Sequence, residues 1–154
     1  MEVTQKMQKQ YEFPYMPCLL EMRVTLFMNE IGGNKTKENL RKSVSHFIEG
    51  KCISEGYVKP NTVNVQSYTS GTIKGEKVEF LVVFECSICN PSEGTRIHNC
   101  KVNSKTKAGI HASVKDGNFT PVTVFVIRDH FLENRNYEDV KEGDLIDISV
   151  IGSR

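Results

Sequence analysis

Three cysteines and a histidine fall within the short stretch CSICNPSEGTRIHNC, which runs from Cys86 to Cys100. Cys86 and Cys89 have the C-x-x-C spacing of many zinc ligands, and His98 and Cys100 follow them. A structural zinc site needs four ligands that converge tetrahedrally. Metal binding is therefore the first chemistry to consider, and a catalytic Cys–His pair is the second.

The pattern around these residues argues against both kinds of site. Cys86 belongs to a segment, Val78–Ile88, in which apolar and polar residues alternate as in a strand. In an extended chain, residues three apart point to opposite faces, so Cys86 and Cys89 would not meet at one metal. A second C-x-x-C or an H-x-x-x-H is missing, and no third group orients a Cys–His pair. We expect no zinc, no other metal, no cofactor and no catalytic residue. Cys86 is interpreted as a small buried side chain, with Cys89 and Cys100 flanking a domain junction.

A basic stretch offers a different chemistry. Gly94–Val114 contains no Asp or Glu. Basic strands on a small barrel attract single-stranded nucleic acid, and an exposed aromatic ring can stack on a base. Phe125, with Ile110 or His111 on the next strand, would supply that ring. The candidate nucleic-acid-binding residues are Arg96, Lys101, Lys105, Lys107, His111 and Phe125. The alternative is that the lysines solvate a turn and that Phe125 lies in the core.

Composition limits the class of protein. The chain has 154 residues, enough for one large domain or two small ones, and a formal net charge of +1. A near-neutral molecule does not attract nucleic acid or anionic membrane as a whole, so any such attraction must be local. No apolar run reaches membrane-spanning length, and the polar start MEVTQKMQKQ lacks a signal core. With an odd number of cysteines, five, we expect an intracellular protein without a disulfide framework.

The first half predicts an α+β domain over residues 15–91, after a flexible arm at residues 1–14. Alternation predicts a strand over Met22–Met28. The stretch KTKENLRKSVSHFIEGK then predicts a helix, capped by Asn34 or Thr36 and ended by Gly50. Its expected buried positions are Leu40, Val44, Phe47 and Ile48. Three strands follow, at Gly56–Val58, Thr62–Thr69 and Val78–Ile88. The last is expected to be central, because both of its faces are largely apolar.

The second half predicts a small all-β barrel over residues 92–154. Its expected strands are Thr95–Ser104, Ala108–Lys115, Pro121–Arg128 and Asp144–Gly152. Asp129–Val140 is too polar for a confident fifth strand. We therefore expect an open or irregular barrel whose free edge is blunted by Asp144, Asp147 and Arg154.

The order of several short motifs resembles the stalk subunit family of multisubunit RNA polymerases, which comprises the seventh subunit of RNA polymerase II and its archaeal relative. The motifs are MRVTLFM, FIEGKCISEGYV, GTIKGEKVEFLVVFECSICNPSEGTRI, AGIHASV, VTVFVIRDHF and GDLIDISVIGSR. The resemblance covers roughly residues 20–154. The chain departs from the family in two ways: the C-S-I-C stretch matches no family feature with an assigned role, and the barrel ends one strand early.

The resemblance implies a non-catalytic subunit with an N-terminal tip domain and an S1-type barrel of the oligonucleotide-binding (OB) class. The tip domain would dock on the polymerase core, here through Gly50, Lys51, Gly56 and Tyr57, and the barrel would contact nascent single-stranded RNA. A small helical partner of the fourth-subunit type is implied as well. The resemblance implies an intracellular location with the transcription machinery, in the nucleus. A short, divergent version would fit a large DNA virus, and a viral protein would instead be in a cytoplasmic viral factory or the virion. The alternative is a free-standing S1/OB-type RNA-binding accessory protein.

Overall fold

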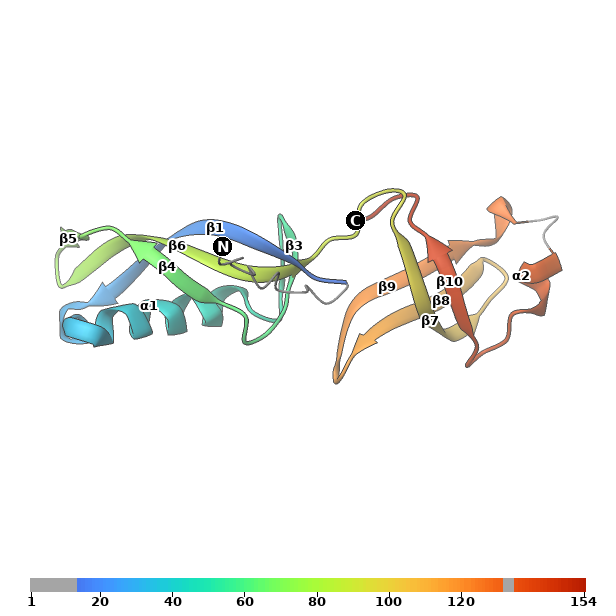
Figure 1. Cartoon of the computed structure of the whole chain (residues 1–154), viewed down its shortest axis with the longest axis horizontal. Coiled ribbons are helices and arrows are strands. Elements are labelled where there is room, and N and C mark those ends of the chain that lie inside the picture. Colours follow the sequence, from blue (N-terminus) through green and yellow to red (C-terminus); the bar gives the residue numbers. More distant parts are fainter. Residues whose placement is uncertain (1–13, 132–134) are drawn as a thin grey trace, which may run out of the picture. The chain divides into compact units, whose positions relative to one another are not determined.

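The computed structural model describes residues 14–131 and 135–154, and this part of the chain is mostly antiparallel β-sheet with few helices (Figure 1). Two compact units divide it, the first ending at Asn90 and the second spanning Pro91–Arg154. Each unit has its own sheet and its own hydrophobic cluster. The arm expected at residues 1–14 lies outside the described residues, apart from Pro14.

The first sheet is organised around one long strand, β6 (Lys77–Cys89). Along one side, β6 pairs antiparallel with β1 (Met16–Phe27) over the whole length of β1. Along the other side it pairs with three short strands in turn: β5 (Thr72–Lys74), β4 (Asn64–Tyr68) and β3 (Gly56–Val58). A two-residue strand, β2 (Cys52–Ile53), pairs with β3. The prediction that this apolar segment is a central strand is confirmed.

Helix α1 (Gly33–Ile48) contributes one row of buried side chains to the core of this unit. The row repeats every four residues and consists of Thr36, Leu40, Val44 and Ile48. Phe47 was expected in the core, but its side chain lies beside this row and is 58% exposed. The expected cap is wrong too, because the helix begins at Gly33 and Gly32 is its N-cap. The Thr36 hydroxyl instead accepts a hydrogen bond from the Gly32 amide at 2.9 Å.

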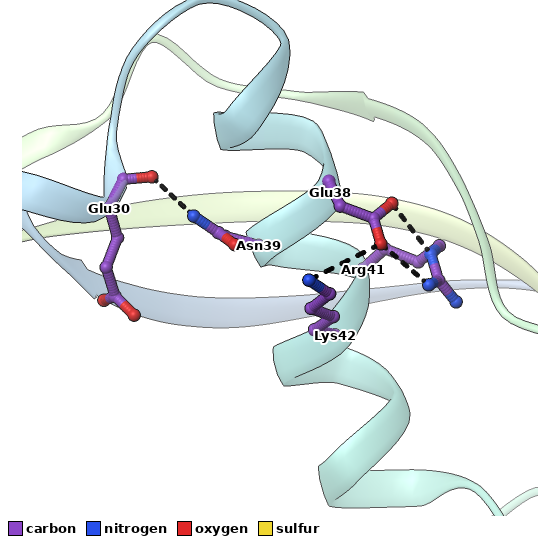
Figure 2. A network of polar contacts seen from close by, with 5 residues as sticks. All are labelled: Glu30, Glu38, Asn39, Arg41 and Lys42. Carbon is purple, nitrogen blue, oxygen red and sulfur yellow. Dashed lines mark hydrogen bonds and ion pairs between the residues drawn. The ribbon is translucent and has the colours of Figure 1, made fainter.

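The turn before α1 is tied to the helix by side chains. A short 3-10 helix, η1 (Met28–Glu30), follows β1. Its last residue, Glu30, accepts a hydrogen bond on its carbonyl oxygen from the Asn39 side-chain amide at 2.8 Å (Figure 2). On the helix surface, Glu38 pairs with Arg41 at 2.9 Å (Figure 2). The Asn39 contact shows which flank of α1 is turned toward the end of β1.

The core of the first unit lies between α1 and one face of the sheet. All six β6 residues that alternation assigned to a single face are buried: Val78, Phe80, Val82, Phe84, Cys86 and Ile88. Strand β1 adds Val24 and Leu26, and it begins at Met16 rather than at Met22. The sequence concealed this earlier start, because Pro17 and the adjacent Leu19 and Leu20 interrupt the alternation.

The second unit is a four-stranded antiparallel sheet in the order β10-β7-β8-β9. The strands are β7 (Arg96–Lys105), β8 (Gly109–Asp116), β9 (Phe119–Ile127) and β10 (Leu145–Ser149). Each overlaps a predicted strand, so these four predictions are confirmed. Two short helices, η2 (Arg128–His130) and α2 (Arg135–Asp139), lie between β9 and β10. The described residues contain no fifth strand in this sheet, and β9 and β10 form its edges.

The second core is small and separate from the first. It consists of Ile97, Cys100, Val102, Ile110, Ala112, Val124, Tyr137 and Val150. Tyr137 belongs to α2, so this short helix is packed against the sheet through its aromatic ring. Among the described residues, no helix is both long and apolar enough to cross a membrane.

Candidate nucleic-acid interface

His111 on β8 and Phe125 on β9 form an aromatic pair on the outer face of the second sheet. They are directly opposite each other in the strand register, with ring centroids 4.6 Å apart and an interplanar angle of 46°. Ile110 and Val124 are buried in the core, so the strand alternation turns the neighbouring His111 and Phe125 outward. Phe125 is 46% exposed and therefore does not lie in the core. Of the two neighbours considered for it, His111 rather than Ile110 is its exposed partner.

Gly109 holds the Phe125 ring close to the backbone of β8. A Cβ atom at Gly109 would collide with the carbonyl oxygen of Val126 and would lie 3.0 Å from the Phe125 ring. A side chain here would therefore displace the aromatic pair. Gly109 was not among the residues predicted to form the site, although a glycine inside a strand often marks a close approach of this kind.

Lys101 lies on the same outer face, near the middle of β7. It is opposite Ser113 in the register, whereas the adjacent Cys100 and Val102 point into the core. Ser113 is bonded to the Asn103 side chain at 3.1 Å. The Lys101 side chain makes no hydrogen bond or ion pair with any of the described residues, and Lys101 is exposed. Its ammonium group is available to an anionic ligand beside the aromatic pair.

Arg96 and Lys107 lie at the two ends of β7. Arg96 is the first residue of the strand and is opposite Ser149 of β10, and Lys107 is in the turn before β8. Both residues are exposed. The structure thus spreads these cations along one strand and its turn rather than gathering them at one point, an arrangement suited to an extended polyanion.

Lys105 has a different role from the other candidate cations. Its ammonium group donates hydrogen bonds to the carbonyl oxygens of Tyr137, Glu138 and Val140 at 2.9, 2.8 and 3.2 Å. It also lies 5.3 Å from the centroid of the Tyr137 ring. An ammonium group has three donors, and here all three are used at the C-terminal end of α2. Lys105 therefore anchors this helix to the sheet.

Asp147 places a carboxylate on the outer face near the start of β7. Its two oxygens accept from His98 Nδ1 at 2.9 Å and from the Asn99 amide at 3.0 Å. The hydrogen bond from His98, followed by that from Asn99, lowers the pKa of Asp147. Asp147 was expected to blunt a free edge, but it faces β7. Asp144, which had the same expected role, instead accepts from the Lys141 amide within the preceding turn at 2.8 Å.

The cysteines of the opening motif are separated into two cores. Cys86 is buried in the first unit and lies opposite Cys18 of β1, whereas Cys100 is buried in the second unit. Burial raises the pKa of both the Cys86 and Cys89 thiols to about 11. No group of three or more His, Cys, Asp or Glu side chains within residues 14–131 and 135–154 is arranged to hold a metal ion. The raised pKa of Cys86 and Cys89 makes these two buried thiols poorly reactive.

The four residues proposed for polymerase docking lie just after α1, at Gly50 and Lys51, and in β3, at Gly56 and Tyr57. Gly50 has a φ of +71° and its amide donates to the Val58 carbonyl at 2.9 Å. The Lys51 ammonium group bonds to the His46 carbonyl at 2.9 Å. A Cβ at Gly56 would lie 2.6 Å from the Cys89 carbonyl, and Tyr57 is opposite Cys89 in the register. Both glycines are thus required by the fold itself.

Comparison with known proteins does not assign the chain to a group. No protein-family model matches it, and no curated protein sequence matches it. The chemistry of the site therefore has to be inferred from the residues. An exposed aromatic pair beside a lysine on an open strand face can stack on a base and neutralise a phosphate.

Proposed function

We propose that this chain is a non-catalytic stalk subunit of a DNA-directed RNA polymerase, which docks on the core enzyme through its first unit and contacts nascent RNA with its second. The order of the quoted motifs supports the polymerase assignment. The second unit is proposed to be an open S1-type barrel of the OB class, and the first unit a tip domain. The same proposal places the protein with the transcription machinery, in the nucleus or in a viral factory or virion, beside a small helical partner.

The observation that carries the RNA-binding part is the exposed His111–Phe125 pair beside Lys101. In OB folds, the face of the second and third strands binds oligonucleotides. Strands β8 and β9 are the second and third strands of this unit. Stacking of a base on an aromatic ring tolerates any sequence, so we propose binding with little sequence preference.

Replacement of the exposed ring tests the stacking role. Phe125→Ala should weaken binding of a single-stranded RNA of about twelve nucleotides by about 1–3 kcal/mol, the value of one stacked base. Phe119→Ala is the matched control, because Phe119 is on the same strand and is equally exposed, at 45%. Fluorescence anisotropy measures both variants. Equal affinities for the two variants would remove the aromatic pair from the interface.

The salt dependence of RNA affinity distinguishes the lysines proposed to contact phosphates from Lys105, which is bonded to α2. Lys101→Ala and Lys107→Ala together should reduce the slope of log affinity against log salt by about 1.4, because each phosphate contact in a single strand contributes about 0.7. Lys105→Ala should leave that slope unchanged, since its ammonium group is bonded to α2. A slope that depends on Lys105 alone would contradict this division of roles.

Association with a polymerase distinguishes the proposed function from its alternative. A fragment of residues 15–90 should still capture the large polymerase subunits, identified by mass spectrometry, whereas a fragment from residue 92 onward should not. A free-standing S1/OB-type RNA-binding protein would bind RNA without retaining polymerase subunits. Capture by the second fragment alone would show that docking is assigned to the wrong unit.

A further inference from the structure

Strand β1 has a long edge that no other strand covers in the described part of the chain. It is 12 residues long and pairs only with β6, along one side. Its other side presents backbone N–H and C=O groups, and natural proteins usually pair or protect such an edge. Exposed apolar side chains accompany it, with Met16 69% and Leu19 65% exposed.

The side chains of β1 are complementary to themselves in one antiparallel register. If Met22 lies opposite Met22 of a second copy, Glu21 of each chain lies opposite Arg23 of the other. In the same register Leu20 lies opposite Val24, and Leu19 opposite Thr25. Glu21 and Arg23 are both exposed, on the face away from α1. Opposite charges at directly opposed positions stabilise a strand pair.

The neighbouring registers lack this complementarity. A two-fold axis that relates antiparallel strands keeps α1 of both copies on one face, so only shifts of two residues are open. One such shift places Glu21 opposite Glu21, and the other places Arg23 opposite Arg23. Like charges in direct opposition destabilise a strand pair. The charges therefore favour the register centred on Met22 over both of its neighbours.

The position of Phe47 agrees with a second copy at this edge. Asn39 bonds to Glu30 of η1, just after the end of β1 (Figure 2). Lys37 and Arg41, in contrast, line a hollow beside β4. Phe47 directly precedes the buried Ile48, as Asn39 directly precedes the buried Leu40, so both lie on the same flank of the buried row, toward β1. The Phe47 ring is 58% exposed there. In the paired sheet the two α1 helices would be about three strand spacings, or roughly 14 Å, apart. Packed helices approach to about 8–10 Å, so the interval leaves room for both Phe47 rings.

We propose that β1 pairs with β1 of a second copy of this chain, in the register centred on Met22, to form one continuous sheet across a two-fold symmetric dimer. This inference is independent of the proposed function. Its interface consists of the two β1 edges, the reciprocal Glu21–Arg23 pairs and the Phe47 rings above them.

Charge reversal tests the register in the full chain, with sedimentation equilibrium as the measurement. The unaltered chain should show a concentration-dependent dimer. Arg23→Glu places like charges opposite each other twice and should weaken the dimer by at least about tenfold. Combining it with Glu21→Arg should restore the dimer, because the charges are then exchanged but still opposed. Arg23 also lies 3.6 Å from Glu79, so Glu79→Gln is the control that removes this contact without affecting the edge.

A cross-link tests the symmetry axis independently. Met22→Cys, in a chain with Cys18→Ser and Cys52→Ser, should form an intermolecular disulfide when diamide oxidises the two thiols, because directly opposed Cβ atoms are about 4.5–5.5 Å apart. Ser70→Cys in the same background should not cross-link, since residue 70 lies outside β1. A monomer at all concentrations, a dimer insensitive to Arg23→Glu, or failure of the exchanged pair to restore it would overturn the proposal. Dimerisation only with an added strand from another protein would overturn it too.

Discussion

The ammonium group of Lys105 joins two segments that are more than thirty residues apart in the sequence. We expect Lys105→Met, which keeps the apolar stem, to lower the free energy of unfolding by about 1–2 kcal/mol, because the α2 carbonyls lose a charged donor. Lys107→Met, in an exposed turn, should change it by less than about 0.5 kcal/mol. Urea unfolding measures both. Equal losses would show that α2 does not depend on this anchor.

The buried thiols give the first unit a dependence on alkaline pH. Burial raises the pKa of Cys86 and Cys89 to about 11, above the value near 8.5 of an unfolded thiol. The unfolded chain therefore loses these protons first as the pH rises. The two protonated thiols therefore make their full contribution to the free energy of unfolding below about pH 8.5, and this contribution is lost as the pH rises toward 11.

Urea midpoints measured between about pH 8 and pH 11 check this dependence. The fall in stability should be smaller in Cys86→Ala, and unchanged in Cys52→Ser, because Cys52 is exposed. At neutral pH, alkylation of the native chain should modify Cys52 well before the buried thiols. Rapid alkylation of Cys86 would indicate a reactive thiol and favour the catalytic interpretation.

Residue roles were predictable where the partner is fixed by a strand pattern. His111 and Phe125 could be proposed as neighbours because alternation sets which side chains of adjacent strands share a face. The partners of Lys105 and Asp147 could not. Lys105 meets the end of a short helix, and Asp147 sits where the pairing of β7 and β10 shifts register. Neither arrangement leaves a local sequence signal.

At the scale of elements, α1 shows that an apolar residue at helical spacing is not always a buried one. Leu40→Ala should destabilise the first unit by about 2–5 kcal/mol, because Leu40 is fully buried. Phe47→Ala removes a larger side chain from the same helix, yet it should cost less than about 1 kcal/mol at concentrations too low for dimerisation, since the ring is 58% exposed. Urea unfolding measures the free energy of unfolding of both variants. A larger loss for Phe47 would return it to the core.

The strands of this chain were predictable where alternation or turn residues mark them. β6 carries a clear period of two and was predicted close to its observed bounds. The four strands of the second sheet were predicted as short segments between separators rich in Gly, Asn, Asp and Lys, and they also lie close to their predicted bounds. β2 and β5 have two and three residues, too few to show a period, and were missed. The cap of α1 was misplaced, because glycines at 32 and 33 allowed the helix to start before any capping side chain.

At the scale of the whole molecule, the two hydrophobic clusters share no residue. Leu40→Ala should therefore accelerate hydrogen exchange in β1 and β6 but leave exchange in β7 and β8 unchanged. Ile97→Ala, in the second core, should give the reverse pattern and serves as the matched control. Mass spectrometry of the exchanged chain measures both. Faster exchange throughout the chain in either variant would mean that the two units unfold together.

The central position of β6 affects how the chain folds as it is made. Every other strand of the first sheet except β2 pairs with β6 directly, yet β6 comes last of them in the sequence. During synthesis, at roughly 5–20 residues per second, β1 waits several seconds without its neighbour. In that interval the short strands β3, β4 and β5 lack the strand with which they pair, and α1 lacks the sheet face on which it packs. A ribosome that stalls before Lys77 is therefore expected to hold an unfolded segment with an apolar strand available to chaperones.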